Sequence, residues 1–161
     1  IVEDKFMKAV NFEDLLVEIL RSFMETSNKE IKLTSNNDKN KFDIKRSPEI
    51  IYGLRNFIGN AVKFSRNKVE VEIVSNDKDI CIKISDDGPG FPDDIIKIVG
   101  EPYIRSKSKK INNKSGLGLG TFLGKTLLER QGAKLKFNKN NKYKGAQVEI
   151  SWSVKSLAFN S

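Results

Sequence analysis

The hydrophobic residues of this chain follow two spacings, one helical and one strand-like. Amphipathic helices are predicted where apolar side chains recur every three or four positions, in residues 11–23, 48–64 and 117–131. Asn11 is a plausible N-cap for the first helix, and Ser47 before Pro48 is typical of the start of the second. Gly132 is expected to end the third helix.

Six segments alternate polar and apolar residues, as strands with one buried face do. They are residues 30–34, 41–45, 68–74, 79–85, 135–138 and 146–154. Turn-forming clusters separate them two by two, so three strand pairs are predicted, the first made of residues 30–34 and 41–45. This order predicts an α+β fold, a two-layer α/β sandwich in which a mixed, mostly antiparallel sheet is covered on one face by helices.

The length of 161 residues, 38% of them hydrophobic, fits a single domain. Residues 1–10 show no clean period and are predicted to be a linker or the end of an upstream segment, so the domain is expected to span residues 11–161. The apolar stretches are short and interrupted by charges, so we expect that this chain does not span a membrane.

The formal net charge is +8, and the chain contains no histidine. The lysines are scattered, as on a solvated surface, and neither a zinc-ligand spacing nor an RNA-binding aromatic motif accompanies them, so no nucleic-acid partner is expected. The single cysteine, Cys81, lies between Ile80 and Ile82 in a predicted strand and is interpreted as a packing residue.

Three polar residues of the second predicted helix share one face. Asn56 and Asn60 are four positions apart and Lys63 is three further on, so all three project from neighbouring positions. An amide oxygen suits Mg²⁺, and a lysine can neutralise phosphate charge. The alternative is a solvated helix face with incidental amides.

Two glycine-rich segments carry further candidate chemistry. Asp86 leaves the end of an apolar strand and could accept a hydrogen bond from an exocyclic amine such as that of adenine, while Gly88 and Gly90 permit close approach to a planar ligand. An ordinary Asp-Gly-Pro-Gly turn is the alternative. Gly116 and Gly118 open a helix whose N–H groups favour phosphate, after a lysine-rich stretch that is a candidate lid.

Together and in this order, these motifs resemble those of the ATP-binding catalytic domain of bacterial sensor histidine kinases, the HATPase_c domain of the GHKL superfamily. The matching segments are residues 56–64, 86–90, 100–103 and 116–119, within a resemblance that runs from about residue 11 to residue 152. Residues 48–56 and 118–130 are similar to the RegB/PrrB type of redox-responsive kinase in particular.

The resemblance implies a Bergerat ATP-binding fold that binds Mg-ATP. It implies that Asn60 is the Mg²⁺ ligand and that Asn56 and Lys63 are catalytic residues near the phosphates. Asp86 would bind the adenine amine. The other residues implied to contact the nucleotide are Gly88, Gly90, Tyr103, Arg105, Lys107, Gly116, Leu117, Gly118 and Leu119.

The activity implied by the resemblance is a histidine protein kinase reaction. The γ-phosphate would pass to a histidine on a dimerisation domain absent from this chain, and then to an aspartate of a response regulator. Because the chain has no histidine, it should not autophosphorylate alone. The full-length protein is expected to be a homodimer in the bacterial inner membrane, with this domain in the cytoplasm.

Two other classes of function stay open. The first is a conformational ATPase or serine-kinase regulator of the same superfamily, although the hydrolysing members place a glutamate base where Asn56 stands, and an amide cannot activate water. The second is a non-enzymatic basic binding module, which would show salt-sensitive binding of nucleic acid.

Overall fold

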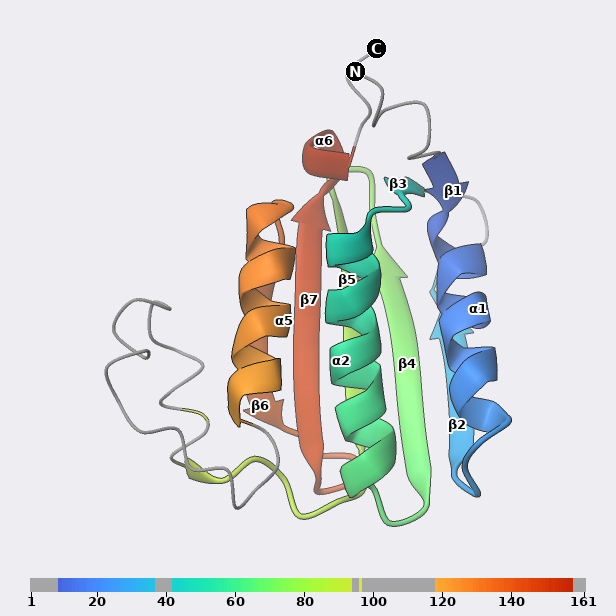
Figure 1. Ribbon diagram of the computed structural model, residues 1–161, viewed down its shortest axis with the longest axis vertical. Helices are drawn as coiled ribbons and strands as arrows, with labels where there is room; N and C mark the ends of the chain where they lie inside the picture. The colour runs from blue at the N-terminus through green and yellow to red at the C-terminus, as the bar shows by residue number, and fades with distance from the viewer. Residues whose placement is uncertain (1–8, 37–41, 94–95, 97–117, 158–161) are drawn as a thin grey trace.

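The computed structural model describes residues 9–36, 42–93, 96 and 118–157 of the chain. Three long helices lie side by side over one face of a five-stranded sheet (Figure 1). The helices are α1 (Phe12–Met24), α2 (Pro48–Phe64) and α5 (Gly118–Arg130). The strands, in spatial order, are β2 (Glu30–Ser35), β4 (Lys68–Ser75), β5 (Asp79–Asp86), β7 (Ala146–Ser153) and β6 (Lys134–Lys139).

The sheet is mixed, because β2 runs parallel to β4 whereas the other neighbouring strands are antiparallel. The predicted two-layer α/β sandwich with a mostly antiparallel sheet is therefore confirmed. Two short strands, β1 (Ala9–Asn11) and β3 (Asp43–Lys45), form a separate antiparallel ribbon, and α6 (Val154–Leu157) follows β7.

The helices begin and end where local sequence signals predict. The Asn11 side chain accepts a hydrogen bond from the N–H of Asp14 at 3.0 Å, and the Ser47 hydroxyl accepts one from the N–H of Ile50 at 3.1 Å. Both bonds satisfy an N–H group that has no partner within its helix. Gly132 follows α5 with a φ of 91°, in the left-handed region that glycine adopts at little cost.

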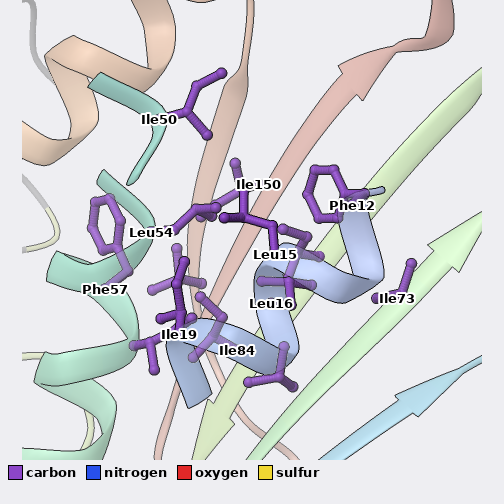
Figure 2. Close-up of a cluster of buried hydrophobic side chains, with 14 of the residues drawn as sticks. Phe12, Leu15, Leu16, Ile19, Ile50, Leu54, Phe57, Ile73, Ile84 and Ile150 are labelled. Atoms are coloured by element: carbon purple, nitrogen blue, oxygen red, sulfur yellow. The ribbon is translucent and has the colours of Figure 1, made fainter. Parts of the chain in front are cut away.

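The core lies between the helix layer and the sheet. Figure 2 shows Leu15, Leu16 and Ile19 of α1 packed with Leu54 of α2 and Ile150 of β7, all of them almost inaccessible to solvent. The strands supply every second residue to this core, as their alternating burial shows. This packing brings the C-terminal half of α2 against the end of β5, where the candidate site residues lie.

The predicted pairing of the first two strands is wrong. Residues 30–35 form β2, but β2 pairs over six positions with β4, from Glu30 opposite Lys68 to Ser35 opposite Ile73. The short β3 pairs with β1 instead, which places Ile44, a fully buried residue, opposite Val10. Alternation fixes which face of a strand is buried but not which strand is its partner, and β4 offers a longer ladder than the three residues of β3.

The ribbon also bears on where the folded part begins. Ala9 and Val10 belong to β1, within the segment expected to be a linker, and Val10 packs against the core. The last two residues of the expected linker are therefore part of the folded structure. The sequence also has a short helix-like run at residues 93–99, of which the structure describes residues 93 and 96.

Candidate functional site

A cavity of about 310 Å³ opens between the C-terminal half of α2 and the ends of β5 and β7. Most of its lining is apolar, and the polar side chains on its wall are Asn60, Asp86 and Thr121. The apolar lining residues include Phe57, Ala61, Phe64, Ile84, Phe91, Ala146 and Val148. An apolar pocket with a few converging polar groups is the usual form of a small-molecule site.

Asp86, the last residue of β5, lies on the wall of this cavity and is 4% exposed. Its Oδ1 accepts hydrogen bonds from the N–H of Gly88 at 2.8 Å and the N–H of Ala146 at 3.3 Å. Burial raises the pKa of this carboxyl above its usual value, although these two bonds oppose the shift. Within the described residues both hydrogen bonds of Asp86 go to Oδ1, so Oδ2 is available to a ligand in the cavity.

The neighbouring carboxylate, Asp87, has a different environment. Its Oδ1 accepts from the N–H groups of Arg66, Asn67 and Lys68 at 2.8, 3.0 and 3.1 Å, across the turn that joins α2 to β4. Its partial burial acts to raise the pKa, but these N–H groups outweigh that effect and the pKa of Asp87 is lowered. Asp87 therefore stabilises a turn, whereas Asp86 faces the cavity.

Glycines allow the backbone segments around Asp86 to approach one another. A Cβ at Gly88 would overlap the carbonyl oxygen of Phe64, and a Cβ at Gly145 would overlap the carbonyl oxygen of Asp86. Gly90 has a φ of 84° and contributes to the cavity wall. Of the two predicted glycines, Gly90 thus reaches the cavity, while Gly88 packs against the end of α2.

The predicted polar stripe of α2 is present. The Asn60 Nδ2 lies 3.4 Å from the Asn56 Oδ1, and it donates to the Thr121 Oγ1 of α5 at 3.2 Å. Asn56 packs against α5, where a Cβ at Gly124 would lie 3.2 Å from its Oδ1. Glycine on α5 therefore allows the two helices to meet at these amides.

Lys63 is exposed, and its ammonium lies 5.2 Å from the centroid of the Phe64 ring, which lines the cavity. It also borders a shallow hollow on the helix layer, together with Arg55, Asn56 and Asn60. Asn60 lines both the hollow and the cavity, so the apolar cavity and the cationic surface meet at its side chain.

Some site residues were not singled out by sequence reasoning. Thr121 is 2% exposed on the cavity wall, and its only sequence signal is a polar side chain directly after the glycine repeat. The N–H of Ala146 reaches Asp86 from 60 positions along the chain, which no local pattern indicates. The Tyr143 hydroxyl donates to the Glu70 Oε2 at 2.6 Å and so fastens the turn before Ala146 to β4.

Part of the predicted site lies beyond the described residues. Tyr103, Arg105, Lys107, Gly116 and Leu117 fall in that part, as does the candidate lid. Gly118 and Leu119 are the first two residues of α5. The roles predicted for these residues remain predictions.

These features define a class of protein, a two-layer sandwich with a cavity between its helices and its sheet. The buried carboxylate of Asp86 and the side-chain amide of Asn60 both line that cavity. A family model described as "Histidine kinase-, DNA gyrase B-, and HSP90-like ATPase" matches residues 45–156, and the chain belongs to this family of ATP-binding domains.

The relatives point to sensor kinases. Sensor histidine kinase RegB of Cereibacter sphaeroides is 40% identical over 129 residues, which cover 71% of this chain and 28% of RegB. The chain thus spans less than a third of that relative. The resemblance to the catalytic ATP-binding domain of sensor histidine kinases, and to RegB in particular, is therefore confirmed.

Solved structures agree on the fold. The ATP binding domain of PrrB from Mycobacterium tuberculosis matches with a TM-score of 0.67 at 21% identity, covering 91% of this chain and 97% of that one. The catalytic domain of the histidine kinase ThkA matches with a TM-score of 0.74 at 16% identity, covering 93% and 98% of the two chains. In residues 9–36, 42–93 and 118–157, no helix is long and apolar enough to cross a membrane.

Proposed function

We propose that this domain binds Mg-ATP with the adenine ring in the cavity and the Asp86 Oδ2 accepting a hydrogen bond from the adenine amine. The observation that carries the proposal is a nearly inaccessible carboxylate, on the wall of an apolar cavity, with one oxygen held by backbone N–H groups and the other available. A charged hydrogen bond of this kind contributes about 1.5–3 kcal/mol, enough to select a base that has a donor at that position.

The polyphosphate would extend from the cavity along α2. Asn60 fits a Mg²⁺ ligand because its Nδ2 faces two acceptors, so that, in the part of the chain that the structure describes, Oδ1 has no hydrogen-bond partner. Mg²⁺ commonly takes few protein oxygens and completes its shell with phosphates and water. When bound, the ion neutralises phosphate charge. Lys63 would add a positive charge at the same end, and Asn56 would lie beside it.

The reaction we propose is transfer of the γ-phosphate to a histidine on a dimerisation domain outside this chain. Positioning and charge neutralisation account for most of the catalysis of phosphoryl transfer, so the domain needs no nucleophile of its own. The phosphate would then pass to an aspartate of a response regulator. We further propose a homodimeric full-length protein in the inner membrane, with residues 11–161 as its cytoplasmic ATP-binding domain and residues 1–10 as a link whose last two residues pair in β1.

The superfamily alternative, a hydrolysing ATPase, is less well supported. It would need a base to activate water, and the residue at that position is Asn56, an amide that packs against Gly124 and accepts from Asn60. An amide cannot remove a proton from water at neutral pH. This environment favours a domain that keeps ATP intact for another acceptor.

The test is to mix the chain with a histidine-bearing dimerisation fragment of the full-length protein and ATP labelled on the γ-phosphate. Label should appear on the fragment in a form lost in acid, as expected for phosphohistidine, and not on this chain alone, which has no histidine. A dimerisation fragment with its histidine replaced by glutamine is the control. Labelling of this chain without the fragment, or steady release of inorganic phosphate, would contradict the proposal.

A further inference from the structure

We propose that Thr121 is a positioning residue that orients the Asn60 side-chain amide so that its oxygen faces a bound Mg²⁺. This inference rests on the proposed function, because it assigns a task to Thr121 within the same site. Thr121 belongs to the first turn of α5, and its side chain lies on the cavity wall with 2% of the residue exposed.

The geometry at Asn60 supports the assignment. A side-chain amide has two N–H donors on its nitrogen and acceptor sites only on its oxygen. The Asn60 Nδ2 lies 3.4 Å from the Asn56 Oδ1 and 3.2 Å from the Thr121 Oγ1, so both of its donors have an acceptor. Turning the amide over would place its oxygen against the Asn56 oxygen, where two acceptors would face each other. With Asn56 oriented as it is in this structure, the observed orientation is the one that gives the Asn60 nitrogen an acceptor on both sides, and the Thr121 hydroxyl holds it there. Within the described residues, Oδ1 of Asn60 then has no hydrogen-bond partner.

The two neighbours are not equivalent. Asn56 is itself an amide on the same helix, one turn away, and its contact with the Asn60 nitrogen is the longer of the two, 3.4 Å against 3.2 Å. Thr121 comes from α5, and its hydroxyl is buried between the two helices. Among the described residues, the Thr121 hydroxyl is therefore the hydrogen-bond partner from outside α2 that holds the Asn60 amide, and it connects the proposed metal ligand to the helix that follows the glycine repeat.

A purely structural role for Thr121 makes a different prediction. If its hydroxyl only fastened α5 to α2, its removal would lower the melting temperature and leave the effect of Mg²⁺ on ATP affinity unchanged. If it orients Asn60, its removal should reduce the gain in affinity that Mg²⁺ provides, so ATP binding with the ion should weaken more than ATP binding without it.

The experiment uses Thr121→Val, which keeps the shape and removes the hydroxyl, and Thr121→Ser, which keeps the hydroxyl. ATP affinity is measured by calorimetry with Mg²⁺ and with EDTA. The dissociation constant in EDTA divided by that in Mg²⁺ is then compared between variants. The ratio should fall about three- to ten-fold in the valine variant, the change expected for one hydrogen bond, and return to the wild-type value in the serine variant. In an Asn60→Ala background, Thr121→Val should change the ratio no further.

The outcomes separate the two proposals. An unchanged ratio in Thr121→Val, or equal weakening with and without Mg²⁺, overturns the role of Thr121 and leaves ATP binding intact. A wild-type domain that binds ATP equally well with and without Mg²⁺ also overturns it, together with the metal role of Asn60. A wild-type domain that binds no adenine nucleotide at all overturns the proposed function itself.

Discussion

The two ends of the site are constructed differently. At the cavity end, the polar group is Asp86, and backbone N–H groups from two segments hold one of its oxygens in a buried position. At the α2 end, the polar groups are Asn56, Asn60 and Lys63, and side chains contact one another on a partly exposed helix face. The cavity end is thus fixed by the backbone, and the α2 end by side-chain contacts and exposed charge.

This difference has consequences for binding. A buried carboxylate held by the backbone has a fixed position, and its charge is little screened by solvent. Removing that charge should therefore lower ATP affinity strongly, by an amount that does not depend on salt. At the α2 end, an exposed cation such as Lys63 would act through its charge, so its effect should depend on ionic strength. An amide that shares a metal ion with the phosphates would act only when Mg²⁺ is present. Each end can therefore be tested under the conditions to which it should respond.

The largest expected effect is from Asp86→Asn. The variant loses the charge of the hydrogen bond to the adenine amine and presents an amide N–H₂ in its place, so ATP affinity should fall about ten- to one-hundred-fold. Calorimetric titration with ATP in low and high salt measures this, and the loss should be the same in both. An affinity within two-fold of wild type would show that the base does not bind at Asp86.

The same variant should not lose stability. Burial raises the pKa of Asp86 in the folded state, so the fold disfavours the ionised form. That cost is absent below the unfolded pKa and is complete above the folded pKa. The melting temperature of Asp86→Asn without nucleotide should therefore equal or exceed that of wild type at neutral pH. The difference should shrink as the pH falls through the raised pKa, which a series of thermal melts would show.

The second effect is from Asn60→Ala at the α2 end. With its amide oxygen gone, the gain in ATP affinity on adding Mg²⁺ should drop about ten-fold, while affinity in EDTA should change less than two-fold. Titrations with and without the ion measure both quantities in one preparation. Equal loss in the two conditions would assign Asn60 to the nucleotide rather than to the metal.

The cavity end also shows what the sequence could predict. Asp86 and Gly90 stand out because a carboxylate and glycines follow an apolar strand, and both line the cavity. The N–H of Ala146 could not be predicted, because β7 meets β5 only through the pairing of the whole sheet. Alternation along β5 places Asp86 on the buried face of Ile82 and Ile84, but the opposite pKa shifts of Asp86 and Asp87 could not be predicted, because that of Asp87 depends on the N–H groups of the turn after α2.

At the α2 end, helical spacing predicts which polar residues share a face, and the contact between Asn56 and Asn60 agrees with it. The partner helix is not encoded in that spacing, so the contact with Thr121 went unpredicted. The wrong prediction of the strand that pairs with β2 has the same origin. Periodicity specifies the buried face of an element, while its neighbour is selected by the packing of the whole domain.

A third effect, on stability rather than binding, comes from Asp87→Asn. The substitution removes the charge that three backbone N–H groups share, and it should destabilise the fold by about 1 kcal/mol because the site is partly exposed. Chemical denaturation measures this, and ATP affinity should stay within two-fold of wild type. The pKa of Asp87 is lowered, so its contribution is present above the unfolded pKa and lost as the pH falls through the folded pKa. If Asp87→Asn weakened ATP binding as much as Asp86→Asn does, the two carboxylates would not have the separate structural and binding roles assigned to them.

The smallest effect is expected from Lys63→Gln. Its ammonium is exposed beside Phe64 at the edge of the cavity, so a charge interaction with phosphate is weakened by solvent and by salt. ATP affinity should fall about two- to five-fold at low ionic strength and approach the wild-type value at high salt. Lys136→Gln is the matched control, because Lys136 is an exposed lysine of β6 and its replacement lowers the net charge equally. If both variants lose the same affinity, the effect belongs to overall charge, and Lys63 has no special place at the α2 end.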